Sequence, residues 1–251
     1  MAILNRTSPC EILDWDTTFF GFRVARVRGN TLTQERVRQM DAWCIRNGVR
    51  CLYFLARTDD ADTAWLAGDN QFRLVDVRMT FEHRLPATVE SARGDTVVRQ
   101  TSVEDVACLQ TIARQSYHDT RFYFDPNFAR HLCDSFYETW IKYSCKGYAD
   151  RVLVAELDGA PAGYITCHLD KEPHTGEIGL VGVSGQARGR GIGRTLVMSA
   201  LEYLSTQGMQ KVRVVTQGRN YAAQRLYQRC GFLTTTVQLW YHKWYVHSET
   251  I

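Results

Sequence analysis

The run GQARGRGIGRTL at residues 185–196 holds four glycines and three arginines within its first ten residues. Such a run suits neither a packed core nor an ordinary helix, because glycine loses backbone entropy there and arginine stays solvated. It follows the strand-like segment GEIGLVGVS and opens a helix expected over about residues 191–206. Backbone N–H groups at a helix N-terminus bind anions. The run therefore predicts a pyrophosphate site, with added charge from Arg188, Arg190 and Arg194.

Two other phosphate-binding motifs fail on this run. A P-loop reads GxxxxGK[ST], and no lysine followed by serine or threonine is present here. A Rossmann fingerprint reads GxGxxG after an N-terminal strand, with an acidic residue about 20 positions later. The run instead has the spacing GxGxG, and it lies late in the chain, at Gly189, Gly191 and Gly193. A solvated basic loop without a ligand is the plain alternative.

Regular elements flank the glycine run on both sides. The helix after it stops at Gly208, KVRVVTQ follows as a strand, and Asn220 caps a short helix that ends at Gly231. A last strand covers about residues 234–245. The apolar stripe of the first of these helices is Leu196, Val197, Ala200, Leu201 and Leu204. Upstream we expect a helix that is capped by Thr101 or Ser102 and runs to about Ser116, a helix over 127–146 and a hairpin turning at Asp158-Gly159.

The first half of the chain repeats part of this layout. Its expected elements are a strand at 22–28, a helix at 33–47, a strand at 49–56, a helix and turn at 59–72, and a strand at 73–85. A turn that ends in Phe72 there matches one that ends in Phe232. Duplication explains the likeness, and so does convergent βαβ patterning. Polar residues 86–95 predict a boundary between domains over 1–90 and 95–251.

The glycine run resembles the pyrophosphate loop of the GNAT N-acetyltransferases, Q/R-x-x-G-x-G/A. It reads Gln186-x-x-Gly189-x-Gly191, and the order of elements over residues 97–245 also resembles that family. Matching positions further on are Asn220, Ala223, Tyr227, Gly231 and Phe232. The resemblance implies an α+β GNAT fold, with a mixed, mostly antiparallel sheet and helices on both faces, preceded by a degenerate GNAT-like N-terminal half. It also implies acetyl-coenzyme A as co-substrate.

The resemblance further implies which residues bind acetyl-coenzyme A. The backbone of Val181 and Val183 would pair with the pantetheine amides, and a nearby N–H would polarise the thioester carbonyl. Asn220 has two compatible roles, helix N-cap and ligand of the pantetheine arm. The residues expected at the pyrophosphate are Gln186, Arg188, Gly189, Arg190, Gly191, Ile192, Gly193 and Arg194.

Tyr227 matches the family's tyrosine that acts as general acid toward the leaving thiolate. A thiol pKa of about 8–9 and a phenol pKa of about 10 make that proton transfer easy. Tyr227 can instead be a core aromatic of an amphipathic helix. Glu177 lies where some members place a catalytic glutamate, with His168 and His174 nearby. All three can also be ordinary strand or surface residues, because a water chain can remove the amine proton.

Within the superfamily the chain resembles the enzymes that acetylate TDP-linked 4-amino-4,6-dideoxy sugars for surface-polysaccharide synthesis. The features that carry this likeness are WDTTFFGFRVARV near the N-terminus, SYHDTRFYFDPNF and an aromatic final strand. The candidate sugar-nucleotide ligands are Arg121 for a phosphate, and Phe122, Tyr123, Trp15 and Phe20 for stacking. A strand packed into the core is the alternative for the N-terminal segment.

Other functions stay open at this level. Within the same fold the acceptor can be a small amine, an antibiotic, or a peptide or protein amine. A non-catalytic acyl-coenzyme A binding module is a second class, which the presence of Tyr227 disfavours. Nucleic-acid binding is disfavoured, because net charge is only +3 and the basic residues gather in one loop.

Composition sets the remaining expectations. The chain has eight cysteines, none in a CxxC pair, which predicts scattered reduced thiols and no metal centre. We find neither a secretory signal pattern nor a run of about 18 apolar residues, so the expected protein is cytoplasmic and not inserted in a membrane. A homodimer is expected from the family resemblance alone.

Overall fold

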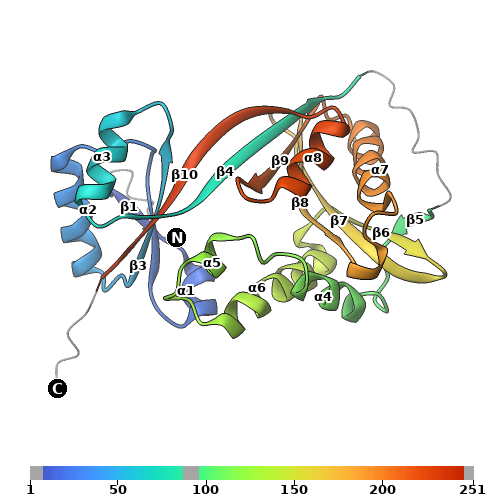
Figure 1. Ribbon diagram of the computed structural model, residues 1–251, viewed down its shortest axis with the longest axis horizontal. Coiled ribbons are helices and arrows are strands. Elements are labelled where there is room, and N and C mark those ends of the chain that lie inside the picture. Colours follow the sequence, from blue (N-terminus) through green and yellow to red (C-terminus); the bar gives the residue numbers. More distant parts are fainter. Residues whose placement is uncertain (1–7, 87–95, 246–251) are drawn as a thin grey trace. The chain divides into compact units, whose positions relative to one another are not determined.

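The structure, a computed structural model, describes residues 8–86 and 96–245. The chain divides into two compact units (Figure 1). The first takes in Met1–Arg78, Phe124–Phe128 and Val237–Ile251, and the second takes in Met79–Tyr123 and Ala129–Thr236. Of the predicted boundary segment, residues 87–95 lie outside the described part of the chain. The chain first passes between units earlier, within β4 (Arg73–Arg84).

The first unit is built on four neighbouring strands in the order β1-β2-β3-β10. They are β1 (Cys10–Ile12), β2 (Val24–Val27), β3 (Cys51–Arg57) and the end of β10 (Leu233–Trp244). The pair β2 and β3 is parallel, and α2 (Gln34–Arg46) connects its members. Helix α2 starts at its cap Thr33, whose hydroxyl accepts the N–H of Arg36 at 3.2 Å. Its buried face adds Val37, Met40 and Cys44 to the core of this unit.

The segment WDTTFF is helical, so the alternative of a core strand is wrong. It lies in α1 (Asp14–Phe20), which starts with the acidic residues Asp14 and Asp16 and ends at Gly21 in a left-handed conformation with φ of 75°. Acidic residues favour the positive N-terminal end of a helix, and glycine adopts positive φ without a Cβ penalty. These local signals outweigh the β-branched and aromatic content of the segment.

The second unit carries the order β10-β4-β9-β8-β7-β6-β5. Its further strands are β5 (Val98–Gln100), β6 (Arg151–Leu157), β7 (Ala160–Asp170), β8 (Thr175–Val183) and β9 (Lys211–Gln217). Pairs β5–β6, β6–β7 and β7–β8 are antiparallel, whereas β8–β9 is parallel. The predicted mixed, mostly antiparallel sheet is confirmed. The hairpin turns at Asp158 and Gly159 as expected, with φ of 54° and 77°.

Five α-helices of the described second unit connect these strands, besides a π-helix at Ser144–Tyr148 and a 3-10 turn at Gly185–Ala187. They are α4 (Val106–Arg114), α5 (Arg121–Phe124, whose last residue belongs to the first unit), α6 (Arg130–Tyr143), α7 (Ile192–Thr206) and α8 (Tyr221–Arg229). Neighbouring residues of β7 show that both sheet faces are covered. A Cβ on Gly163 would lie 3.1 Å from Leu196 of α7, whereas Tyr164 reaches Tyr117 just after α4. Helices on both faces of the sheet are thus confirmed.

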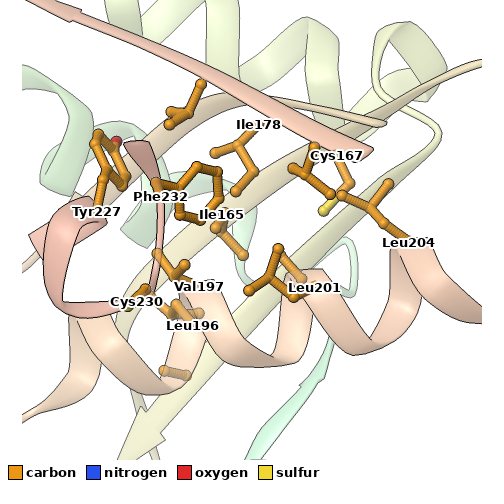
Figure 2. Close-up of a cluster of buried hydrophobic side chains, with 14 of the residues drawn as sticks. Ile165, Cys167, Ile178, Leu196, Val197, Leu201, Leu204, Tyr227, Cys230 and Phe232 are labelled. Atoms are coloured by element: carbon orange, nitrogen blue, oxygen red, sulfur yellow. The ribbon is translucent and has the colours of Figure 1, made fainter. Parts of the chain in front are cut away.

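The predicted apolar stripe of α7 forms one side of the core of the second unit. Figure 2 shows Leu196, Val197 and Leu201 beneath Ile165 and Phe232. All five residues of the stripe are buried. Burying such side chains contributes about 1.5–3 kcal/mol each, so this face of α7 secures the helix that starts at the glycine run.

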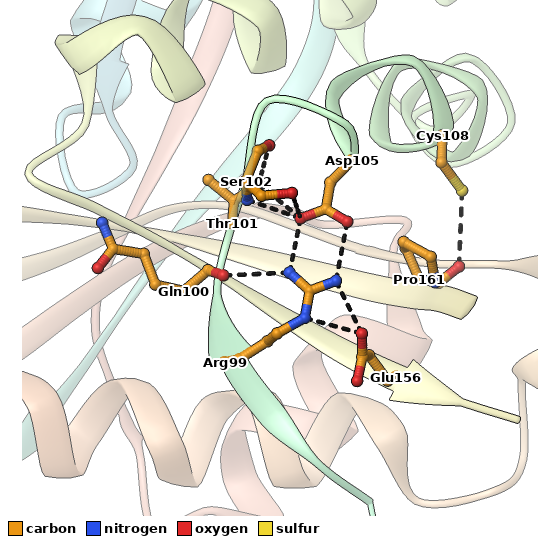
Figure 3. A network of polar contacts seen from close by, with 8 residues as sticks. All are labelled: Arg99, Gln100, Thr101, Ser102, Asp105, Cys108, Glu156 and Pro161. Atoms are coloured by element: carbon orange, nitrogen blue, oxygen red, sulfur yellow. Dashed lines mark hydrogen bonds and ion pairs between the residues drawn. The ribbon is translucent and has the colours of Figure 1, made fainter. Parts of the chain in front are cut away.

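Helix α4 starts later than the expected Thr101 or Ser102, because a polar network holds the residues before it as a turn (Figure 3). The Asp105 carboxylate accepts the N–H of Ser102 at 2.7 Å and two hydrogen bonds from Arg99 at 2.7 and 2.9 Å. Arg99 also donates to Glu156 of β6 at 2.7 Å. The network joins the start of α4 to the β5–β6 edge.

The element order supports the repeated layout seen in the sequence. In the first unit β2, α2, β3, α3 (Ala61–Asp69) and β4 follow one another as β8, α7, β9, α8 and β10 do later. The pairs β2–β3 and β8–β9 are both parallel. Phe72 and Phe232 are buried after left-handed Gln71 and Gly231, with φ of 64° and 82°. Common ancestry of the halves stays a prediction.

Candidate functional site

The glycine loop (residues 185–193) joins β8 to α7 and exposes its backbone. Gly189 and Gly191 are left-handed, with φ of 77° and 81°. Apart from chain neighbours, no heavy atom of the described residues lies within 4 Å of a Cβ placed on either glycine. Helix α7 starts at Ile192, so its first-turn N–H groups face this open loop. The geometry suits a bound anion.

The side chains of the loop divide into two sets. Arg188, Arg190 and Arg194 are exposed, which leaves their positive charge available to phosphates. Ile192 is buried in the core, and a Cβ on Gly193 would lie 3.2 Å from Leu226 of α8. Ile192 and Gly193 therefore pack α7 against its neighbours. Of the two residues, only the backbone can contact a ligand. Gln186 is exposed.

Strands β8 and β9 part beside the glycine loop. Their parallel pairing ends at Ile178↔Val214, and both strands continue beyond that pair. The N–H of Ser184 donates to Ala162 of β7 at 2.8 Å, so backbone alternation turns the polar groups of Val183 and Val181 toward the β9 side. There the register gives them no β9 partner. An extended ligand with amide groups can pair with this open edge.

A bulge in β8 precedes the open edge. Between the pairs Ile165↔Val181 and Cys167↔Ile178, β8 holds one residue more than β7. The Thr166 hydroxyl accepts the N–H of Leu180 at 2.8 Å inside this bulge. A bulge bends its strand, which explains why β8 leaves β9 here.

Tyr227 combines both roles considered for it. Its ring belongs to the core of the second unit, where Figure 2 shows it beside Phe232. The centroid of the Tyr227 ring lies 5.8 Å from that of Phe232 and 6.0 Å from that of Phe81. Its hydroxyl makes no side-chain hydrogen bond within the described part of the chain. Burial raises the pKa of Tyr227 above its usual value, so the phenol stays protonated near neutral pH. A proton donor requires that state.

Asn220 caps α8 as predicted. Its side-chain oxygen accepts the N–H of Ala223 at 3.0 Å. The cap uses one side-chain atom, which leaves the amide NH₂ for a ligand. Whether a ligand binds there stays a prediction.

A pair of tyrosines beside β8 was missed by the sequence analysis. The hydroxyls of Tyr117 and Tyr164 lie 3.0 Å apart, and the two residues are named the tyrosine pair below. Tyr164 and Gly182 are register partners across β7 and β8. A Cβ on Gly182 would lie 2.7 Å from the Tyr164 ring. Neither sequence periodicity nor motif spacing relates residues so far apart, so no sequence signal pointed to this contact.

Two arginines tie the segment around Tyr117 to the candidate site. Arg188 of the glycine loop donates to the carbonyl of Gln115 at 3.5 Å. Arg219, directly before Asn220, donates to the carbonyl of Asp119 at 3.4 Å. Residues 115–119 therefore lie beside both the glycine loop and the start of α8.

Glu177, the predicted base, lies on β8 just before the bulge and is exposed. Its register partners are His168 on β7 and Arg213 on β9. A Cβ on Gly179 would lie 2.8 Å from His168 Nε2, so His168 leans toward the bulge. His174 lies in the turn before β8 with φ of 56°. No structural contact assigns one of them as base.

The expected acceptor residues Arg121, Phe122 and Tyr123 form most of α5 in the second unit. Phe122 is buried, and the Arg121 guanidinium carbon lies 4.4 Å from its ring centroid. The Tyr123 hydroxyl donates to Asp134 at 2.6 Å. Burial and this carboxylate raise the pKa of Tyr123. Direct contact with a ligand is thus open to Arg121 and Tyr123, while Phe122 serves packing.

The other two acceptor candidates lie in the first unit. Trp15 is 41% exposed and stacks on Phe19, with ring centroids 5.1 Å apart. Phe20 is buried, 4.6 Å from the ring centroid of Phe128. Trp15 thus lies partly exposed at the surface of this unit, whereas Phe20 belongs to an aromatic core.

Neither a metal cluster nor a membrane-spanning helix is found in the part of the chain that the structure describes. No group of three or more His, Cys, Asp or Glu side chains is placed there to hold a metal. None of its helices has the length and apolar character to cross a bilayer. All eight cysteines are free thiols, six of them buried.

Similarity to known proteins agrees with this geometry. A dTDP-fucosamine acetyltransferase from Escherichia coli is 27% identical over 93% of this chain and 97% of its own length. The spore coat polysaccharide biosynthesis protein SpsD from Bacillus subtilis is 28% identical over 56% of this chain, but only 48% of that relative is matched. In fold, a GCN5-related N-acetyltransferase from Kribbella flavida has a TM-score of 0.61 at 14% identity, covering 96% of this chain and 89% of that one.

The sequence model of the acetyltransferase (GNAT) family matches residues 113–232. That range starts at the end of α4 and ends just before β10, so it includes the glycine loop, the open edge of β8 and Tyr227. Residues 113–232, which lie in the second unit apart from Phe124–Phe128, are therefore identified as a GNAT acetyltransferase domain.

Proposed function

We propose that the protein transfers the acetyl group of acetyl-coenzyme A to the 4-amino group of a TDP-linked 4-amino-4,6-dideoxy sugar. The observation that carries the acetyl transfer is the open edge of β8 beside the glycine loop, with Tyr227 in the same unit. The acceptor rests on the similarity to a dTDP-fucosamine acetyltransferase over nearly the whole chain. Surface-polysaccharide synthesis is the process this acceptor would serve.

Acetyl-coenzyme A suits the residues that are present. Its pantetheine arm is extended and carries two amides, which the backbone of Val181 and Val183 can pair with as a further strand would. Its pyrophosphate suits the first-turn N–H groups of α7. Arg188 and Arg190 can meet the phosphates from the exposed side of the loop.

The reaction is a direct transfer between the two substrates. The neutral amine attacks the thioester carbonyl carbon, so a C–N bond forms and the carbonyl oxygen becomes an oxyanion. Collapse of the oxyanion breaks the C–S bond, and the departing thiolate takes the hydroxyl proton of Tyr227. The acetylated nitrogen loses one proton to Glu177 or to water, and solvent returns a proton to Tyr227. The products are an N-acetyl sugar nucleotide and free coenzyme A.

The acceptor contacts proposed within the second unit come from α5. Arg121 would bind a phosphate of the sugar nucleotide, and Tyr123 would stack on its base or sugar, as planar groups do. Trp15 of the first unit is a separate candidate for stacking, because the residue is 41% exposed.

The test is a mass-spectrometric transfer assay with acetyl-coenzyme A and a panel of TDP- and UDP-linked amino sugars, small amines and peptides. Tyr227→Phe is assayed beside Tyr203→Phe, which removes a phenol hydroxyl from α7. We expect acetylation of TDP-4-amino-4,6-dideoxygalactose, slowed about 10²-fold or more in Tyr227→Phe and unchanged in Tyr203→Phe. If only small amines or peptides are acetylated, the proposed sugar-nucleotide acceptor is wrong, while the proposed acetyl transfer stands. No acetylation of any acceptor, with acetyl-coenzyme A still bound, would overturn both.

A further inference from the structure

The tyrosine pair is a polar contact in the second unit that the transfer described above does not use. Tyr164 is fully buried and Tyr117 is partly exposed. Each hydroxyl can donate one hydrogen bond and accept others, and their mutual contact uses only one of the two hydrogen atoms. No further side-chain hydrogen bond engages either hydroxyl within residues 8–86 and 96–245. The pair therefore has hydrogen-bonding capacity left for another molecule.

The tyrosine pair lies against the segment of β8 proposed to bind pantetheine. Gly182 sits between Val181 and Val183, and a Cβ on it would lie 2.9 Å from Cζ and 3.1 Å from the hydroxyl of Tyr164. The phenol end of Tyr164 thus touches the main chain of β8 at this segment. Any side chain larger than hydrogen at position 182 would displace it.

Tyr117 also lies between the two other parts of the candidate site. The carbonyls two residues before and two residues after it, at Gln115 and Asp119, accept from Arg188 and Arg219. Its ring stacks on Tyr137 at 4.3 Å, which fixes the ring plane. The Tyr227 phenol is close enough to contribute to the raised pKa of Tyr117. These contacts place Tyr117 near the region where the thioester of acetyl-coenzyme A would meet Tyr227.

We propose that the Tyr117 hydroxyl, oriented by Tyr164, accepts a hydrogen bond from the acceptor amine beside the thioester. This inference rests on the acetyl transfer proposed above. The amine must aim its lone pair at the carbonyl carbon, and anchoring one N–H to a fixed oxygen achieves that. Tyr117 is then a catalytic residue that touches the acceptor, and Tyr164 is a positioning residue that acts through it.

The ionisation of the pair agrees with hydrogen bonding and not with proton abstraction. Burial raises the pKa of both Tyr117 and Tyr164 above the usual phenol range. Both hydroxyls therefore stay neutral at any pH at which the enzyme would work. A neutral phenol orients an amine but does not remove its proton.

The test measures initial rates for wild type, Tyr117→Phe, Tyr164→Phe and the double variant, with TDP-4-amino-4,6-dideoxygalactose or whichever acceptor the panel identifies. Tyr203→Phe is the matched control. We expect kcat/KM for the acceptor to fall about 10–10²-fold in Tyr117→Phe, because the amine loses its orientation, and less in Tyr164→Phe. The double variant should equal Tyr117→Phe, because Tyr164 acts through Tyr117. KM for acetyl-coenzyme A should change less than about twofold, and the loss should be the same from pH 6.5 to 9.

Each other outcome overturns a defined part of the inference. If Tyr117→Phe is as active as the control Tyr203→Phe, the Tyr117 hydroxyl does not contact the acceptor. If the loss of kcat/KM in the double variant is the product of the two single losses, Tyr164 does not act through Tyr117, and its positioning role is wrong. If the loss of kcat/KM in Tyr117→Phe becomes larger toward one end of the pH range, Tyr117 transfers a proton, and the proposed role in orienting the amine is wrong. A wild-type protein that acetylates no acceptor overturns the transfer itself, a result distinct from all the others. Should Tyr117→Phe be unfolded by circular dichroism, Tyr164→Phe decides the matter, with control-like activity overturning the inference.

Discussion

Tyr164 and Gly182 face each other across β7 and β8 so closely that a Cβ at position 182 would lie 2.7 Å from Cε1 of the tyrosine ring. The ring is fully buried, so it has no exposed space to move into. The missing side chain of Gly182 is what lets the phenol reach the main chain of β8. Packing of the sheet and placement of the tyrosine pair thus depend on one residue.

Gly182→Ala should destabilise the protein. Overpacking a filled interior costs about 1–3 kcal/mol, because the ring must leave its rotamer or the strands must separate. Urea unfolding followed by circular dichroism measures the loss. Gly185→Ala is the matched control, since nothing lies within 4 Å of its Cβ and its φ is not positive. Equal stability of the two variants would contradict the packing of Tyr164 on Gly182.

Gly191→Ala should weaken the binding of acetyl-coenzyme A, and this loss of affinity should exceed that of a variant with the same loss of stability. An alanine in the left-handed region costs about 1–2 kcal/mol and would turn the loop backbone away from its observed conformation. Gly159→Ala is the control, because it carries the same strain in a hairpin turn with open space around it, at φ of 77°. Calorimetric titration with acetyl-coenzyme A compares the two. Similar Kd values would argue against an anion on the glycine loop.

Asn220→Asp and Asn220→Ala should separate the two roles of that residue. The aspartate keeps a side-chain oxygen for the N–H of Ala223, so its stability should match wild type, while the alanine should lose about 1 kcal/mol. Both lack the amide NH₂. A raised KM for acetyl-coenzyme A in both variants supports the ligand role, and a normal KM in Asn220→Asp leaves the residue as a cap only.

Stability should fall in acid in a way that depends on Asp105. The Arg99 guanidinium, with help from the Ser102 N–H, holds the pKa of that carboxyl below its usual value of 3.8. The folded state therefore binds fewer protons than the unfolded state. The stabilisation is full above about pH 5 and is lost progressively as the pH falls below that value. Asp105→Asn should remove this part of the acid dependence. Asp59→Asn is the control, because Asp59 and its partner Arg57 are both exposed. Thermal melts from pH 2.5 to 7 should show the same acid dependence of stability in this variant as in wild type.

Most of the fold was predictable from local patterns. The stripe of α7, the Asp158-Gly159 hairpin and the cap at Asn220 are where the sequence places them, because each depends on residues a few positions apart. The helix α1 was missed, since WDTTFF is rich in residues that also suit strands. The start of α4 was placed too early, because Arg99 holds Asp105 from the strand before it.

The sequence by itself determined the glycine loop and the position of Tyr227. The glycine run follows from its composition before a helix N-terminus, and Tyr227 follows from the family resemblance at a position in the last turn of a short helix. Only the tertiary structure decided the parting of β8 from β9 and the meeting of Tyr117 with Tyr164. Those depend on strand register, a bulge and a contact across 47 positions, and such distant pairings leave no periodic trace in the chain.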